Sequence, residues 1–296
     1  MVQTSFIITG PTASGKSGFA HALALRVGGF VINCDSVQIY RGIENISASP
    51  FAGRDISDDI DGVPYRLFSI MDLNSQISVS EYLSLAGQAY DDALSQNKVP
   101  IFVGGTGYYI NAIINGMSPM PDISDDNRNL ARELVMFDID SARKMLPNDF
   151  TATDPQRISR ALEVFLETGH HITEFQKQTR IGAVAPNALR VLINPDADVL
   201  RERIATRVPE MVASGAMGEA EDIIANDFDA SRAIGATQLV DYINGKISYE
   251  KCIENWITKT NQYAKRQRTW FRTQYDADVI INHVPTDADI DILLQK

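Results

Sequence analysis

Near its N-terminus the chain reads Gly10-Pro11-Thr12-Ala13-Ser14-Gly15-Lys16-Ser17, directly after the apolar run Ser5-Phe6-Ile7-Ile8-Thr9. This stretch matches the P-loop pattern G-x-x-x-x-G-K-[ST], and the apolar run predicts the buried strand that precedes a P-loop. A strand that turns into a helix at such a loop aims backbone N–H groups and the positive helix end at one point, where a phosphate binds. Lys16 is expected to reach the outer phosphates, and Ser17 to supply a hydroxyl to Mg²⁺. The motif does not specify which phosphate compound binds.

Strands and helices alternate along much of the remaining chain. The sequence predicts helices over about 16–27, 79–96 and 248–273, a helix that begins near 195, and strands over 30–34, 99–103, 189–194 and 278–282. Strands that lead into polar or glycine-rich turns are typical of a doubly wound parallel sheet with its site at the carboxyl edge. We therefore predict an α/β fold built on a P-loop-containing, doubly wound parallel sheet. Residues 44–78 are interpreted as a solvated, flexible segment over the site.

Residues 117–185 break this alternation. They open with Pro119, Pro121 and several aspartates, and then show helical patterns near 125–137 and 155–168 without a clear buried strand. We predict a P-loop core domain formed by residues 1–116 and 186–296, and a helical insertion domain formed by residues 117–185. The insertion carries several arginines, but small-molecule kinases use arginine-bearing insertions as lids, so this domain alone does not distinguish between functions.

The predicted strand over 30–34 leads into Asp35-Ser36-Val37-Gln38. A carboxylate beside a P-loop can hold Mg²⁺ through water or act as a general base, and spacing alone leaves both roles open for Asp35. Ser36 and Gln38 favour an acceptor site, because a glutamine can read the edge of an adenine with two hydrogen bonds. After the strand over 99–103, the cluster Gly104-Gly105-Thr106-Gly107 lets backbone approach a ligand closely.

Composition excludes several classes of protein. The net charge of −11 argues against a uniformly basic nucleic-acid binder, but it leaves room for a local basic patch. The two cysteines are too few for a disulfide framework. No apolar run approaches the roughly 18 residues of a membrane span, so we expect no membrane association and a cytoplasmic location. A monomer is the expected state, because one site is expected per chain.

The predicted C-terminal helix carries such a basic patch. Between Asn255 and Tyr275 there are no acidic residues, and five basic residues are interleaved with four aromatic ones. The basic residues are Lys259, Lys265, Arg266, Arg268 and Arg272, and the aromatic ones are Trp256, Tyr263, Trp270 and Phe271. In a chain that is otherwise acidic, this pattern indicates an RNA-contacting surface. A core helix with inward-facing aromatics and solvated charges would give the same pattern.

Five segments, in order along the chain, resemble the bacterial tRNA dimethylallyltransferases. They are residues 10–17, 35–42, 104–107, 154–163 and 263–272. The resemblance implies transfer of a dimethylallyl group from dimethylallyl diphosphate to the N6 amine of the adenosine 3′-adjacent to the anticodon in tRNA, with release of diphosphate. It also implies that this nucleotide flips out of the anticodon loop into a channel, and that the insertion domain contacts the anticodon stem-loop.

The resemblance assigns roles to individual residues. It implies that the P-loop grips the diphosphate of the donor through Gly10, Pro11, Thr12, Ala13, Ser14, Gly15, Lys16 and Ser17, with Mg²⁺ at Ser17. It makes Asp35 the base that takes the proton of the amine, and it implies that Lys16, Ser17, Thr106 and Arg207 complete the catalytic set. The residues implied to contact tRNA are Asp35, Ser36, Val37, Gln38, Thr106, Arg128, Gln156, Arg157, Ile158, Ser159, Arg160, Lys265, Arg266 and Arg268.

Three short segments depart from the family's usual pattern. The segment Ile46-Ser47-Ala48-Ser49-Pro50 lacks a lysine, Tyr65-Arg66 replaces a pair of histidines, and Ala236-Thr237 replaces a tyrosine followed by a basic residue. None of these departures touches the P-loop or Asp35. They bear on supporting positions and on positions that face RNA.

Two other classes of function stay open at this point. A small-molecule or nucleotide kinase would explain the P-loop and the arginine-bearing insertion, but it leaves the basic C-terminal helix without a role. A nucleotide-switch module would need the guanine-binding motif Asn-Lys-x-Asp, whereas Asn97-Lys98 is followed here by Val99-Pro100.

Overall fold

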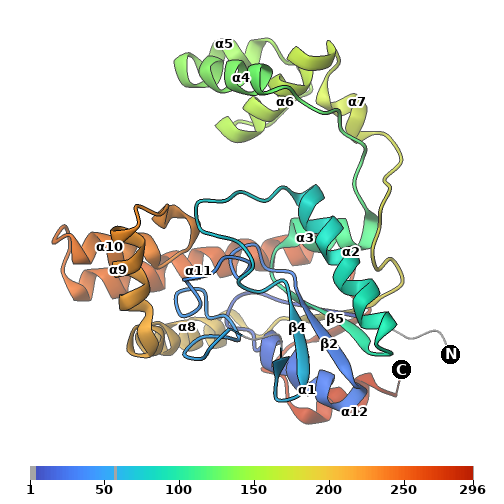
Figure 1. Ribbon diagram of the computed structural model, residues 1–296, viewed down its shortest axis with the longest axis vertical. Helices are drawn as coiled ribbons and strands as arrows, with labels where there is room; N and C mark the ends of the chain where they lie inside the picture. The colour runs from blue at the N-terminus through green and yellow to red at the C-terminus, as the bar shows by residue number, and fades with distance from the viewer. Residues whose placement is uncertain (1–4, 57–58, 296) are drawn as a thin grey trace. The chain divides into compact units, whose positions relative to one another are not determined.

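The computed structural model describes residues 5–56 and 59–295. Two compact units make up the chain: Met1–Ile114 together with Val184–Lys296, and Asn115–Ala183. The junctions fall two residues before those of the predicted insertion, which was placed at 117–185. Figure 1 shows the ribbon of both units.

The larger unit is built on a seven-stranded sheet with the strand order β3-β4-β2-β5-β1-β6-β7. Its strands are β1 Phe6–Thr9, β2 Gly29–Asn33, β3 Asp59–Ile60, β4 Val63–Arg66, β5 Val99–Gly104, β6 Leu189–Ile193 and β7 Val279–Ile281. All neighbouring strands are parallel except β3 and β4, which pair antiparallel. The predicted α/β fold with a mostly parallel sheet is confirmed.

The helices of this unit include the predicted ones with small shifts at their ends. They are α1 Lys16–Val27, α2 Val79–Ser95, α3 Gly107–Asn115, α8 Ala197–Met211, α9 Met217–Ala225, α10 Ala236–Ile243, α11 Tyr249–Gln274 and α12 Asp287–Leu293. Helix α1 ends at Gly28, whose φ of 65° lies in the left-handed region where glycine carries no steric penalty. The sequence patterns did not predict α3, α9, α10 and α12.

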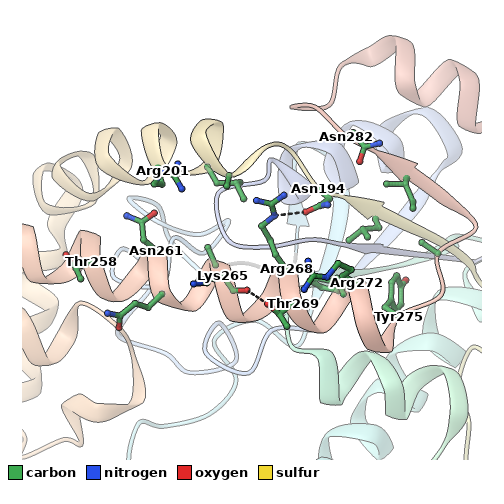
Figure 2. Close-up of a pocket in the computed structure, with 18 residues that line it drawn as sticks. Asn194, Arg201, Thr258, Asn261, Lys265, Arg268, Thr269, Arg272, Tyr275 and Asn282 are labelled. Carbon is green, nitrogen blue, oxygen red and sulfur yellow. Dashed lines mark hydrogen bonds between the residues drawn. The ribbon is translucent and has the colours of Figure 1, made fainter.

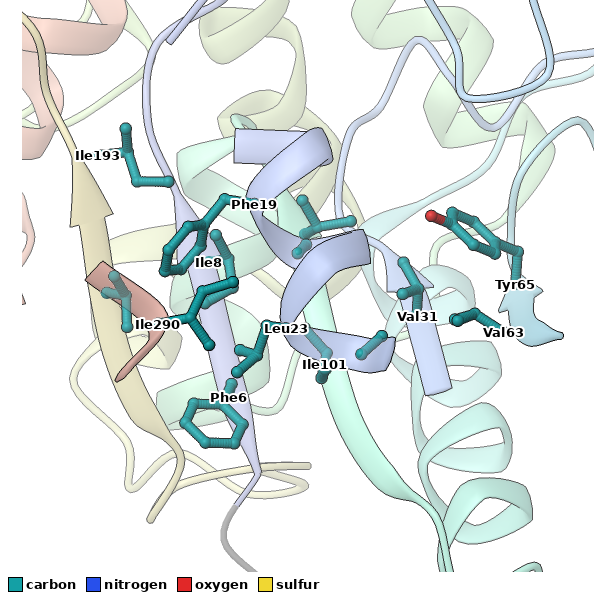
Figure 3. Close-up of a cluster of buried hydrophobic side chains, with 14 of the residues drawn as sticks. Phe6, Ile8, Phe19, Leu23, Val31, Val63, Tyr65, Ile101, Ile193 and Ile290 are labelled. Carbon is teal, nitrogen blue, oxygen red and sulfur yellow. The ribbon is translucent and has the colours of Figure 1, made fainter. Parts of the chain in front are cut away.

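Alternate residues of the central strands point to opposite faces of the sheet. On one face, Phe6 and Ile8 of β1 pack in a cluster with Phe19 and Leu23 of α1 and Ile290 of α12 (Figure 3). On the other face, Phe102 of β5 stacks against Tyr90 of α2 with ring centroids 6.2 Å apart. Helices therefore cover both faces, and both faces of the central strands are buried, which explains their continuous apolar runs.

The register of the three central strands sets the position of the site. Thr9 of β1 pairs with Gly104 of β5, and Asn33 of β2 pairs with Val103 of β5. The residues that follow these strands, Gly10, Cys34 and Gly105, must therefore meet at one edge of the sheet. Ligands of open α/β sheets bind at this carboxyl edge.

The interpretation of residues 44–78 as a solvated, flexible segment is wrong for much of its length. Ile46 and Phe51 are buried, and strand β4 extends the sheet by pairing in parallel with β2. Tyr65 of β4 packs edge-on against Phe51 with centroids 5.8 Å apart. The apolar residues that do this are irregularly spaced among glycines, prolines and aspartates, so they give no periodic signal. Residues 57 and 58 lie outside the described part.

The smaller unit is helical. It contains α4 Asp125–Phe137, α5 Ile139–Lys144, α6 Pro155–Thr168 and α7 Ile172–Gln176. Its own core includes Ala131 of α4 and Ile158 and Leu162 of α6. The two predicted helical segments coincide with α4 and α6, whereas α5 and α7 are shorter than two turns and were not predicted. In the described part of the chain, every helix is too short or too polar to cross a bilayer.

Candidate active site

The P-loop follows β1 directly and leads into α1. Gly15 is the N-cap residue of α1 with a φ of 95°, a conformation that glycine adopts without strain. The backbone N–H groups of Lys16 and Ser17 lie in the first helical turn, so they have no partner within the helix. With α8 the loop lines a pocket of about 520 Å³. The pocket thus combines free N–H donors with the positive end of a helix, as a phosphate site requires.

Cationic side chains from two elements gather at this pocket. The Lys16 ammonium lies 3.3 Å from the carbonyl oxygen of Pro11 and donates to it. Burial lowers the pKa of Lys16 to about 8. The positive charge of Arg207 also lowers this pKa, whereas the negative charge of Asp35 raises it. From α8, Arg207 donates to Thr12 Oγ1 at 2.7 Å and Arg203 donates to the carbonyl oxygen of Ala13 at 2.8 Å.

The Arg207 side chain is largely shielded from solvent. Burial lowers its pKa to about 10, with a further contribution from Arg203. Its Nε has no hydrogen-bond partner among the described residues. Both Lys16 and Arg207 remain protonated at pH 7, so together with Arg203 they give the pocket more positive charge than its two glutamates, Glu202 and Glu210, offset.

Asp35 occupies a tight turn after β2. Its backbone N–H donates to Asn33 Oδ1 at 2.8 Å, and its Oδ1 accepts from the backbone N–H of Val37 at 2.9 Å. Asn33 also donates to the carbonyl oxygens of Asp35 and Leu67. The turn fixes one carboxylate oxygen of Asp35, whereas its Oδ2 has no hydrogen-bond partner among the described residues. A half-exposed carboxylate held in this way can accept a proton from a substrate.

Thr106 sits beside this turn at the end of β5. Its Oγ1 accepts from the backbone N–H of Ser36 at 2.9 Å and donates to Ser36 Oγ at 3.1 Å. Tyr263 of α11 lies nearby: burial and the charge of Asp35 raise the pKa of its phenol, whereas Arg266 and Thr106 oppose this rise. Asp35, Ser36 and Thr106, all predicted from sequence, are therefore brought together, and Tyr263 joins them from a distant segment.

Gln38 is oriented by its own loop. Its Nε2 donates to the carbonyl oxygens of Ser47 and Ala48 at 3.1 and 3.0 Å. A two-bond reading of an adenine edge needs this nitrogen as well as Oε1, so the amide in this orientation offers a substrate only the oxygen. The loop that holds it is the segment in which the chain departs from the family pattern.

Glu219 of α9 anchors that loop. Its carboxylate accepts from the backbone N–H groups of Asn45 and Ile46 at 2.7 and 2.8 Å, and burial raises its pKa. Replacing Glu219 by alanine is expected to lower the free energy of unfolding by about 2 kcal/mol, because partly buried donors lose their acceptor. Urea denaturation of this variant and of Glu221→Ala, an exposed carboxylate on the same helix, measures the difference. Equal stability of the two variants would contradict the anchoring role.

The glycines at the end of β5 and just after it let neighbouring protein segments, and not only a ligand, approach this backbone closely. A Cβ on Gly104 would lie 2.1 Å from the carbonyl oxygen of Cys34, and one on Gly105 would lie 2.3 Å from Gln267 Nε2. A Cβ on Gly107 would collide with the ring of Trp270. The cluster Gly104–Gly107 is therefore needed for packing of the β5 end against β2 and α11.

The predicted RNA-binding residues of α11 lie on different sides of the helix. Arg266 lies over the ring of Tyr263 at 5.7 Å, on the side of Asp35 and Thr106. Lys265 and Arg268 point into a groove of about 930 Å³ on another side of the helix (Figure 2). The basic residues of α11 thus form two surfaces. Trp256 and Phe271 are buried, so the aromatics of the pattern serve largely as core.

The groove is lined by cationic and apolar side chains from α8, α11, β6 and β7. Arg268 Nε donates to Asn194 Oδ1 at 3.2 Å, which fixes the guanidinium at the groove (Figure 2). Arg272 adds positive charge, whereas Arg201 is paired with Asp198 of the same helix; among the described residues no aspartate or glutamate lines the groove itself. In a chain of net charge −11, such a surface attracts an anionic partner.

In the insertion unit, the predicted tRNA-contacting residues are not all available. Ile158 is 1% exposed and lies in the core of the unit, and Ser159 is buried beside it. Ile158 packs in the core that α4 and α6 share, so its side chain faces the interior of the unit, and the Ser159 side chain is likewise shielded. Gln156 and Arg157 are exposed; Arg157 pairs with Asp154 at 3.4 Å, and Arg160 pairs with Glu163 at 2.9 Å. On α4, Arg128 is exposed and pairs with Asp125 at 3.4 Å.

Sequence patterns missed two residues of the site. Gln267 of α11 bonds to both the P-loop and the β5 loop, and Arg203 supports the P-loop together with Arg207. Arg203 stood among several arginines of one predicted helix, and nothing in the spacing singled it out. Gln267 lies in the family-like segment 263–272, but it is uncharged, so the basic and aromatic pattern of that helix assigned it no role.

The fold and the site define a P-loop α/β protein with a cationic phosphate pocket and a carboxylate beside it. The chain belongs to the IPP transferase family. The family model described as IPP transferase matches residues 38–274, and the one described as isopentenyl transferase matches residues 3–61.

Individual relatives agree with this membership. A tRNA dimethylallyltransferase of Allorhizobium ampelinum is 37% identical over 286 residues, covering 91% of each chain. A tRNA isopentenylpyrophosphate transferase from Bacillus halodurans, whose crystal structure is known, superposes with a TM-score of 0.68 at 29% identity, covering 99% of this chain and 95% of its own. A eukaryotic dimethylallyltransferase solved acting on tRNA gives a TM-score of 0.74 at 25% identity over 95% of this chain and 74% of its own.

Proposed function

We propose that this protein transfers a dimethylallyl group from dimethylallyl diphosphate to the N6 amine of the adenosine 3′-adjacent to the anticodon in tRNA. One observation carries the proposal most directly. The pairing of β1 and β2 with β5 brings the Asp35 carboxylate to the same edge of the sheet as the P-loop, where its charge partly offsets the lowering of the pKa values of Lys16 and Arg207 by burial. A proton acceptor thus adjoins a site for an anionic leaving group, which is the arrangement that alkylation of an amine by an allylic diphosphate needs.

The proposed step forms a bond from the adenine nitrogen to the allylic carbon and breaks the bond from that carbon to the diphosphate oxygen. The departing oxygen keeps the electron pair, and Lys16, Arg207 and the N–H groups of the P-loop stabilise its negative charge. Asp35 takes the proton that the amine loses. Thr106 holds Ser36 beside Asp35, so it supports the turn that positions this base.

Mg²⁺ fits this pocket in combination with the donor. Among the described residues, no group of three or more histidine, cysteine, aspartate or glutamate side chains could hold a metal alone. Ser17 lines the pocket beside Lys16, and Mg²⁺ commonly binds few protein ligands together with phosphate oxygens and water. Ser17 would hold the ion, which would neutralise part of the diphosphate charge.

The acceptor adenosine has to leave its stack to reach the carboxyl edge of the sheet. We assign contacts with the flipped nucleotide to residues 35–38 and Thr106. The helical unit of residues 115–183 would contact the anticodon stem-loop through Arg128, Gln156, Arg157 and Arg160, and α11 would contact RNA through Lys265, Arg266 and Arg268. We place this activity in the cytoplasm, with the protein acting as a monomer.

The proposal is tested by incubating the purified protein with Mg²⁺, labelled dimethylallyl diphosphate and an anticodon stem-loop that carries adenosine 3′ of the anticodon. We expect label in the RNA, and none when that adenosine is replaced by another nucleotide. Absence of label, together with ATP consumption in the presence of a small-molecule acceptor, would instead identify a kinase.

The basic residues of α11 give a separate prediction. The double substitution Arg266→Glu, Arg268→Glu is expected to weaken stem-loop binding at least about tenfold and to flatten its salt dependence, because phosphate contacts release counterions. Binding measured over a series of salt concentrations tests this. Lys251→Glu, at the start of the same helix, is the matched control. The single variants then show which side of α11 contributes. Unchanged affinity in the double variant would remove α11 from the RNA interface.

A further inference from the structure

Gln267 bridges the two loops that form the site. Its Oε1 accepts a hydrogen bond from the backbone N–H of Thr12 at 2.8 Å, in the P-loop. Its Nε2 donates to the carbonyl oxygen of Gly105 at 3.0 Å, next to Thr106. The side chain is 6% exposed, so neither bond is replaceable by solvent water without rearrangement. One buried amide therefore spans the gap between the phosphate-binding loop and the loop beside Asp35.

The surroundings are shaped to hold this amide. A Cβ on Gly105 would lie 2.3 Å from Gln267 Nε2 and 3.2 Å from the carbonyl oxygen of Gly10, so only glycine leaves room for the bridge. The Thr12 hydroxyl accepts from Arg207 at 2.7 Å. Arg207 thus holds the side chain of Thr12 and Gln267 holds its backbone, so hydrogen bonds link α8, the P-loop and the loop of Thr106.

We propose that Gln267 is a positioning residue that sets the separation between the diphosphate-binding P-loop and the acceptor side of the site. The inference rests on the proposed function. Alkyl transfer needs the allylic carbon, held through its diphosphate at the P-loop, in line with an amine held beside Asp35. The rate of such a transfer is sensitive to displacements of about 1 Å, which can change it roughly 100-fold. Among the described residues, Gln267 makes side-chain hydrogen bonds to both halves.

The substitution Gln267→Glu tests the bridge through its pH dependence. A protonated carboxyl can donate to Gly105 and accept from Thr12 as the amide does, whereas an ionised carboxylate cannot donate and repels the diphosphate. Burial raises the pKa of a carboxyl, so the protonated form should be populated near neutral pH. At pH 8 we expect the Gln267→Glu variant to transfer about 10- to 100-fold more slowly than the unmodified protein. The rate of the variant divided by that of the unmodified protein should rise at least about tenfold between pH 8 and pH 6.

A second variant separates positioning from charge and from folding. Gln267→Met retains the size but makes neither bond, so its kcat should fall about tenfold or more, with KM for the donor changed less than about threefold and with no recovery at low pH. Gln274→Glu, an exposed glutamine on the same helix, should behave like the unmodified protein. A role in folding alone would reduce the active fraction of both Gln267 variants equally at every pH.

The outcomes distinguish the inference from the proposed function. If the unmodified protein does not label the stem-loop, the proposed function fails. If it does, but the ratio for Gln267→Glu stays constant from pH 6 to pH 8, or if Gln267→Met keeps the full kcat, the positioning role of Gln267 is wrong. Recovery of Gln267→Glu at low pH, without recovery of Gln267→Met, supports it.

Discussion

Asp35→Asn is expected to lower the rate of prenyl transfer by about 100- to 10,000-fold while leaving donor binding nearly unchanged. The amide oxygen of asparagine can still accept from the backbone N–H of Val37, so the turn after β2 is preserved, but the side chain no longer accepts a proton. The P-loop is untouched. The measurement pairs single-turnover transfer with titration of dimethylallyl diphosphate at pH 7.

Asp35→Ala is the comparison variant, since it removes the bond to Val37 as well as the base. Equal transfer by Asp35→Asn and Asp35→Ala would show that the loss comes from the missing base rather than from the turn. A parallel loss of donor affinity and transfer in Asp35→Asn would instead assign Asp35 to a metal site. Transfer by Asp35→Asn at the unmodified rate would exclude a role as base.

Lys16→Met is expected to weaken binding of the donor diphosphate by about 100-fold, because a buried charged donor to the leaving group is lost. The unmodified protein should also lose donor affinity as the pH rises. Burial lowers the pKa of Lys16 to about 8, so its ammonium is protonated below this pH and neutral above it. Since diphosphate binds to the charged form, affinity should be highest below pH 8 and decline above it, with the midpoint shifted upward in the complex.

Lys16→Arg is the matched control for the pH dependence, because arginine keeps its charge throughout this range. Its donor affinity, whatever its absolute value, should vary less between pH 7 and pH 9 than that of the unmodified protein. Calorimetric titration with dimethylallyl diphosphate measures both. An unchanged pH profile in Lys16→Arg would assign the decline to another group, and donor affinity retained in Lys16→Met would remove Lys16 from the diphosphate site.

The P-loop shows how far a local pattern determines structure. Residues 10–17 carry their own glycines, lysine and serine in a fixed spacing, and the apolar run before them can only be buried as a strand. Helix α1 begins at Lys16 and ends at Val27, as its sequence predicts. Long helices with clear caps, such as α4 and α6, were likewise predictable, because their signals lie within the segment itself.

Short elements were not predictable in this way. Strand β4 and helices α5, α7 and α12 span few residues, so their apolar positions do not repeat often enough to define a period. What holds them is tertiary contact: Tyr65 of β4 and Ile290 of α12 pack in the same core cluster as α1. Ile158 gives a related case, since a family pattern placed it against RNA and the core of the insertion buries it.

The sequence by itself predicted the P-loop, the central strands and longer helices of the α/β fold, and Asp35 as a candidate site residue, because these signals lie in residues that are neighbours in the chain. The role of Asp35 as a base came from the family resemblance. Only the tertiary structure decided which distant side chains complete the site. The pairing of β1 with β5 and of β5 with β2 brings the P-loop, Asp35 and Thr106 to one edge. The packing of α11 on that edge then inserts Gln267 between them, about 250 residues after the loop that it holds. Such a contact leaves no trace in local spacing, because it exists only when the chain has folded.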